Sequence, residues 1–80
     1  MRIAIISIFV ENKNEIEKVN AILHEYSNFV YGRLGLPKIK ENLNVICLVV
    51  KASGDDISSM TGKLGNLNGV SAKATYAKEN

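Results

Sequence analysis

Two segments of the chain are apolar at odd and even positions alike, and this pattern restricts the available folds more than any other feature. They are residues 3–6, Ile-Ala-Ile-Ile, and residues 45–50, Val-Ile-Cys-Leu-Val-Val. Their β-branched residues favour strands. A strand that is apolar on its two sides is normally covered on both faces of its sheet. We therefore expect two central strands that require cover on both sides.

A strand and an amphipathic helix make up the first part of the chain. The strand covers residues 3–10, and Asn12 or Asn14 provides the capping side chain of the helix that follows. The apolar residues of this helix recur with the 3.6-residue period of a helix that packs on a sheet. They are Ile16, Val19, Ile22, Leu23 and Tyr26.

A hairpin occupies the middle of the chain. Residues 28–36 are predicted to form the second strand. The polar segment 37–42 ends this strand and connects it to the third strand at residues 43–51.

A second helix and a last strand complete the pattern. The helix begins at Ser53 or Asp55, whose side chains accept hydrogen bonds from free backbone N–H groups. Gly65 and the pair Asn68-Gly69 end it, and residues 70–77 form the fourth strand. The buried stripe of the helix consists of Ile57, Met60, Leu64 and Leu67.

This order of elements predicts a single α+β domain of ferredoxin-like βαββαβ architecture over residues 1–80. Right-handed crossovers then give an antiparallel sheet in the order 4-1-3-2, with both helices on one face. The other face keeps an apolar centre and a polar rim that includes Arg33, Lys73 and Thr75, which is the composition of a protein interface. A sheet that is simply half-exposed is the alternative.

The size of the chain favours self-association. A chain of 80 residues buries only about 60% of the surface that its unfolded form exposes, so its stability is marginal without further support. Cys47 is the only cysteine, which excludes an intramolecular disulfide and suits a reducing compartment. We therefore predict a homo-oligomer, either a dimer or a tetramer.

The distribution of charge and hydropathy excludes two classes of partner. Ten basic and eight acidic residues leave a net charge of +2, and no run of lysines or arginines forms a nucleic-acid footprint. The apolar run at residues 3–10 is too short for a secretory leader or a membrane span. We expect a cytoplasmic protein that neither binds nucleic acid directly nor enters a membrane.

The sequence offers no recognisable catalytic set. A nucleophile with its base, a pair of carboxylates and a phosphate-binding loop are all missing. His24 falls on the solvated side of the first helix, and Cys47 is interpreted as a small core residue, so neither is predicted as a metal ligand. We expect no enzyme activity, no cofactor and no metal site, unless different subunits pool His24 and Cys47.

The second strand holds the first candidate ligand site, which consists of Tyr31, Gly32, Arg33 and Gly35. The glycines leave the backbone approachable. Strand alternation would place Tyr31 and Arg33 on one face, where the guanidinium suits a carboxylate or a phosphate. The alternative is a bulged edge strand whose Arg33 pairs across a subunit contact.

A flank of small residues on the second helix is an alternative ligand or partner contact. It consists of Ser58, Gly62 and Gly65. A glycine within a helix costs about 1 kcal/mol relative to alanine, which suggests that another group packs close to it. A loose helix end explains Gly65 equally well.

Three segments together resemble the iron-only hydrogenase system regulator family: residues 19–26, VNAILHEY, residues 32–37, GRLGLP, and residues 61–70, TGKLGNLNGV. That family comprises short stand-alone domains similar to ACT domains and to the C-terminal sensing domain of nickel-responsive regulators. The resemblance therefore implies an oligomer under small-molecule or metal control. Nickel-responsive regulators bind metal through several histidines and a cysteine, whereas this chain offers His24 and Cys47 alone.

These observations predict a regulatory or sensor module, a self-associating ACT-like domain that binds a small ligand or a protein partner. By resemblance it is a transcriptional regulator linked to the iron-only hydrogenase system. A structural protein–protein interaction adaptor is the alternative, followed by a small-molecule enzyme of unrecognised type.

Overall fold

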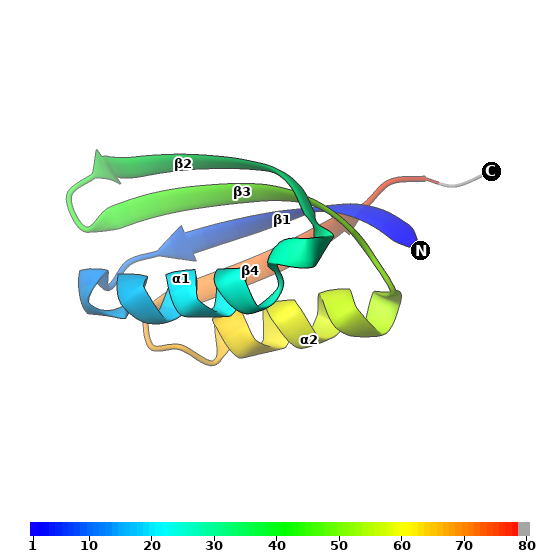
Figure 1. The fold of residues 1–80 in the computed structure, drawn as a ribbon. Coiled ribbons are helices and arrows are strands. Elements are labelled where there is room, and N and C mark those ends of the chain that lie inside the picture. The colour runs from blue at the N-terminus through cyan, green and yellow to red at the C-terminus, as the bar shows by residue number, and fades with distance from the viewer. Residues whose placement is uncertain (79–80) are drawn as a thin grey trace.

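The chain forms a four-stranded antiparallel sheet with two helices packed against one face, as the computed structural model shows (Figure 1). The structure describes residues 1–78. The sheet order β2-β3-β1-β4 confirms the predicted ferredoxin-like arrangement. The elements are β1 (Arg2–Val10), α1 (Ile16–Glu25), β2 (Val30–Lys40), β3 (Leu43–Ala52), α2 (Gly54–Gly65) and β4 (Val70–Tyr76), with 3-10 turns η1 (Lys13–Glu15) and η2 (Ser27–Phe29) on either side of α1.

Two of the predicted capping side chains, Asn12 and Ser53, begin helical segments, although α1 itself follows Glu15 without a side-chain cap. The Asn12 side chain accepts a hydrogen bond from the backbone N–H of Asn14 at 3.1 Å, which starts the 3-10 turn ahead of α1. The Ser53 hydroxyl accepts from the backbone N–H of Asp56 at 3.0 Å and caps α2. These bonds satisfy donors that a helix start leaves without intrahelical partners.

The core lies between the sheet and the helices. From Ala4 onward every second residue of β1 is fully buried on the helix side, while Ile3, Ile5 and Phe9 on the other side remain exposed. The helices contribute the apolar residues of their predicted stripes, although Ile16, Ile22 and Leu67 are only partly buried. The largest fully buried side chains are Ile6, Ile8, Val10, Val19, Leu48, Val50, Ile57, Met60 and Leu64.

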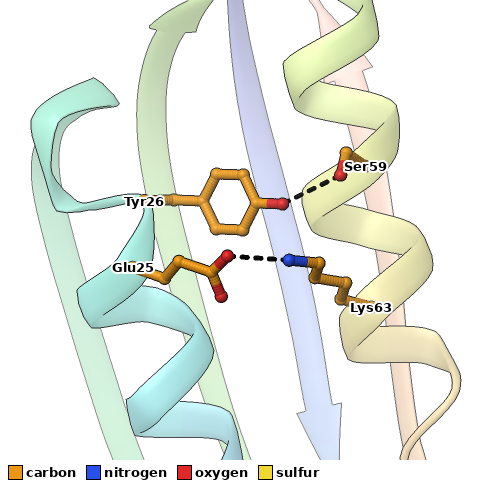
Figure 2. Close-up of polar contacts among 4 residues, drawn as sticks. All are labelled: Glu25, Tyr26, Ser59 and Lys63. Carbon is orange, nitrogen blue, oxygen red and sulfur yellow. Dashed lines mark hydrogen bonds and ion pairs between the residues drawn. The ribbon is translucent and has the colours of Figure 1, made fainter.

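Polar contacts join the two helices above this core (Figure 2). The hydroxyl groups of Tyr26 and Ser59 are hydrogen-bonded at 2.8 Å. One helical turn further along α2, the Lys63 ammonium donates to the Glu25 carboxylate at 2.7 Å. This hydrogen bond, with a further contribution from Tyr26, raises the pKa of Lys63 above its usual 10.5. The pair connects α1 and α2 at the exposed edge of their contact.

The second strand is longer than predicted, and its start and end were both misplaced. It begins at Val30 because η2 occupies the three preceding residues, and it runs through Pro37 to Lys40. Proline is tolerated there because β2 is an edge strand, and the pairing with β3 is irregular between Leu36 and Lys40. Only residues 41–42 form the turn of the hairpin.

Candidate functional site

The face of the sheet opposite the helices carries exposed apolar side chains from three strands, β1, β2 and β3, and we call it the open face. The exposed fractions of these side chains lie between 42% for Val49 and 56% for Leu34. Lys73 and Thr75 of β4, which pair with Ser7 and Ile5, border the open face as predicted. The large apolar members are Ile3, Ile5 and Phe9 of β1, Val49 of β3, and Leu34 and Leu36 of β2.

Cys47 also lies on the open face. It pairs with Ser7 of β1 and with Leu34 of β2, and its side chain is partly exposed. The interpretation of Cys47 as a core residue was therefore wrong, because the register of β3 turns its odd-numbered residues away from the helices.

A bulge in β2 moves Arg33 to the other side of the sheet. Val30 pairs with Val50, but Gly32 pairs with Val49, so Tyr31 is an extra residue in the strand. After this shift Arg33 pairs with the buried Leu48 and lies on the helix side. The predictions that Arg33 borders the open face and shares a face with Tyr31 were both wrong. They assumed strict alternation along β2, and the extra residue Tyr31 interrupts that alternation.

Arg33 instead contacts α1. Its Nη2 donates a hydrogen bond to the side-chain oxygen of Asn20 at 2.8 Å. Asn20 and Arg33 both line two hollows between α1 and β2, and we call this region the α1–β2 groove. The larger hollow has a volume of about 420 Å³ and the smaller about 220 Å³. The larger is lined by Asn20, Leu23, His24, Ser27, Val30, Arg33 and Leu48.

Of the four residues predicted to form the ligand site on β2, only Arg33 and Gly35 line the same hollow. Gly35 lines the smaller hollow together with Arg33. Gly32 pairs with Val49 of the open face, and the Tyr31 side chain at the bulge is 72% exposed. Neither Gly32 nor Tyr31 lines the hollows beside Arg33.

Three polar residues of the groove were missed by the sequence reasoning: Asn20, His24 and Ser27. Their spacing of four and then three positions puts them on one side of a helix, which is a signal in the sequence. That signal does not tell which strand lies opposite, and His24 was interpreted as a solvated residue for that reason.

The groove combines cationic and neutral polar groups with an apolar floor. No carboxylate is among the residues that line either hollow. The ion pairs within residues 1–78 are Lys18–Glu15 and Lys63–Glu25, which leaves Arg33 without an acidic partner there. Ser27 and His24 line the same hollow, but the hydrogen bonds found within residues 1–78 include none between them. Chemically, the arrangement suits binding of an anion rather than activation of a nucleophile.

The flank of small residues on α2 faces away from the rest of the chain. Ser58, Gly62 and Gly65 are all exposed. Apart from the adjoining backbone of its own helix, a Cβ atom built at Gly62 or at Gly65 would have no heavy atom within 4 Å. The described part of the chain therefore packs nothing closely against these glycines.

Metal-binding residues do not gather in the described part of the chain. Residues 1–78 contain no group of three or more His, Cys, Asp and Glu side chains placed to share an ion. His24 lines the groove on the helix side, whereas Cys47 lies on the open face. Among the same residues, no helix is long and apolar enough to cross a membrane.

Comparisons with known proteins agree on the family. The model of the TM1266-like family, described as "Iron-only hydrogenase system regulator, putative", matches residues 2–74. A solved structure of the uncharacterized protein TM1266 from Thermotoga maritima is 36% identical in sequence, with a TM-score of 0.90, and the match covers 96% of this chain and 98% of that chain. No curated protein matches. The family resemblance and the fold predicted from the sequence are thus confirmed.

Proposed function

Because the chain belongs to the TM1266-like family of iron-only hydrogenase system regulators, we propose that it is a self-associating regulatory module that acts by binding. The family name is that of a regulator and not of an enzyme. Regulation by a small domain requires a surface that another molecule can occupy. The open face is the observation that supports this proposal most directly.

A second copy of the chain is the occupant that we propose for the open face. Its apolar side chains are about half exposed, and its lysines, such as Lys51 and Lys73, lie outside the apolar centre. Interface cores are depleted in charge in the same way. A stable interface buries roughly 800 Å² per partner, and the two longer extents of the molecule, 41 and 20 Å, allow a face of that size.

Light scattering at micromolar concentration tests this proposal. The wild-type protein should have at least twice the 8.8 kDa mass of one chain. Ile5→Asp places a charge in the centre of the open face and should give a monomer, because an uncompensated carboxylate is costly to bury. Ser58→Asp puts the same charge on the exposed side of α2 and should leave the mass unchanged. A wild-type monomer, or dissociation by Ser58→Asp alone, would contradict the proposed interface.

The Cys47 thiol provides an independent readout of the same surface. A second copy on the open face covers Cys47, so its rate of alkylation by a maleimide should fall as the protein concentration rises. In Ile5→Asp the rate should be high and independent of concentration. A rate that does not depend on concentration in the wild-type protein would argue against this interface.

The regulatory role that we propose does not include DNA reading by this chain alone. The ten lysines and arginines are nearly balanced by eight acidic residues, and the two arginines, Arg2 and Arg33, lie on different strands, β1 and the edge strand β2. Sequence-specific binding requires a concentrated basic surface that contacts phosphates. The purified protein should therefore not retard a promoter fragment at physiological salt, and specific retardation would contradict this part of the proposal.

A further inference from the structure

We propose that the α1–β2 groove is a binding site for a small carboxylate that carries a short aliphatic body. The proposal deepens the regulatory function proposed above, on which it rests, by naming the chemical class of the ligand. It is carried by the geometry around Arg33, which the bulge in β2 turns toward α1.

Arg33 provides a cation that is directed toward α1. A guanidinium has five N–H donors in one plane, and the single hydrogen bond from Nη2 to Asn20 directs the exposed guanidinium toward α1 while leaving most of those donors free. No carboxylate of residues 1–78 forms an ion pair with Arg33. A planar carboxylate can accept two parallel hydrogen bonds from such a fork.

The surroundings of Arg33 favour a carboxylate with an apolar body. His24 and Ser27 line the same hollow and can donate to the oxygens of an anion, and no lining residue is acidic. The floor consists of Leu23, Val30 and Leu48, of which Leu23 and Leu48 are buried at 4% and 1% exposure. The volume of about 420 Å³ lies within the range of small-molecule sites. An aliphatic group on this floor would remove apolar surface from water.

A separate, lysine-lined hollow outside the groove also offers positive charge to an anion. It lies at the turn between β2 and β3, has a volume of about 460 Å³, and is lined by Lys13, Lys38 and Lys40. The carboxylate of Glu41 also lines it. Lysine ammonium groups are flexible, strongly hydrated point charges. Any anion binding at this hollow should therefore be less selective for a planar carboxylate and an aliphatic body.

The test is a titration of the ¹⁵N-labelled full chain with three probes, followed by NMR. Butyrate should shift the resonances of residues 20–27 and of Arg33 in a saturable way. Butyramide has the same shape without the charge and should not saturate, and inorganic phosphate should bind more weakly than butyrate. The two comparisons separate the contributions of the charge and of the aliphatic body.

Two variants and one matched control locate the interaction. Arg33→Lys keeps the charge but loses the fork, and it should raise the Kd for butyrate by about tenfold or more. Asn20→Asp places a carboxylate beside Arg33, which occupies the guanidinium from within the chain and should abolish saturable binding. Arg2→Lys changes the other arginine, whose guanidinium lies 3.7 Å from the ring centroid of Tyr76, and should leave the Kd unchanged.

The dispersion of the NMR spectrum shows whether each variant is folded. Equal binding of butyramide, tighter binding of phosphate, shifts confined to the lysine-lined hollow, or an unchanged Kd in folded Arg33→Lys and Asn20→Asp would each overturn the proposed site. If butyrate does not bind in the groove, the light-scattering result is unaffected, so the proposed self-association is tested separately.

Discussion

The hydroxyl oxygens of Tyr26 and Ser59 lie 2.8 Å apart across the contact between α1 and α2 (Figure 2). Tyr26 is the last residue of the α1 stripe, and only 8% of it is exposed. A hydroxyl group at such a buried position loses hydration on folding, and its partner on the other helix compensates for this loss. This hydrogen bond and the neighbouring Lys63–Glu25 ion pair are the polar contacts between α1 and α2 within residues 1–78.

Removal of this bond should destabilise the fold. We expect Tyr26→Phe to lower the free energy of unfolding by about 0.5–1.5 kcal/mol, because it leaves the Ser59 hydroxyl without its partner. Urea denaturation of Tyr26→Phe, Ser59→Ala and the double variant measures the effect. The double variant should lose less than the sum of the single variants, and strict additivity would show that the two hydroxyl groups do not interact.

The ion pair between Lys63 and Glu25 should make stability depend on pH at the alkaline end. Its hydrogen bond raises the pKa of Lys63 above the usual 10.5, so the pair stabilises the folded state below that value. The stabilisation should disappear as the pH rises through the raised pKa and the ammonium loses its proton. The stability difference between wild type and Lys63→Gln should therefore shrink from about pH 8 to above about pH 11.

The matched control for this prediction is Lys51→Gln. Lys51 is exposed and has no ion pair within residues 1–78. Thermal unfolding of both variants should show a pH-dependent difference from wild type only for Lys63→Gln. A difference that stays constant across the alkaline range would mean that the ion pair does not stabilise the folded protein.

Two glycines should respond to alanine in opposite directions. Gly62→Ala should stabilise the chain by about 0.5–1 kcal/mol, since a Cβ there meets no neighbour and alanine favours the helix. Gly69→Ala should destabilise it by more than about 1 kcal/mol, because φ is +73° and the new Cβ would lie 2.9 Å from the Cβ of Asn12. Chemical denaturation measures both changes. Destabilisation by Gly62→Ala would indicate that another molecule packs against that side of α2.

Substitutions at the neighbouring residues Ile5 and Ile6 of β1 test the open face and the core separately. Ile6 is fully buried, so Ile6→Val should lower the free energy of unfolding by about 0.5–1.5 kcal/mol. Ile5 is 50% exposed, and Ile5→Val should leave the stability of an isolated subunit nearly unchanged. Its effect should appear instead as weaker association, measured by sedimentation over a range of concentrations. Equal losses of stability at both positions in the monomer would contradict the register of β1.

Much of the architecture could be predicted from local patterns. The double-sided apolar character of residues 45–50 placed β3 in the centre of the sheet, and the capping side chains of Asn12 and Ser53 marked where helical structure begins. Each of these signals depends on a residue and its close neighbours along the chain. Backbone donors at a helix start and the alternation of side chains in a strand are local properties, so the sequence is sufficient to reveal them.

The candidate site could not be predicted in the same way. A bulge at Tyr31 places Arg33 on the helix side, and the sequence around Gly32 does not indicate on which side of the sheet the extra residue leaves its neighbours. Arg33 then meets Asn20, which is 13 positions away in the chain. The sequence by itself determined which elements form and in which order they pair. Only the tertiary structure decided which polar residues share a groove, because one inserted residue in an edge strand reverses the direction of every side chain beyond it.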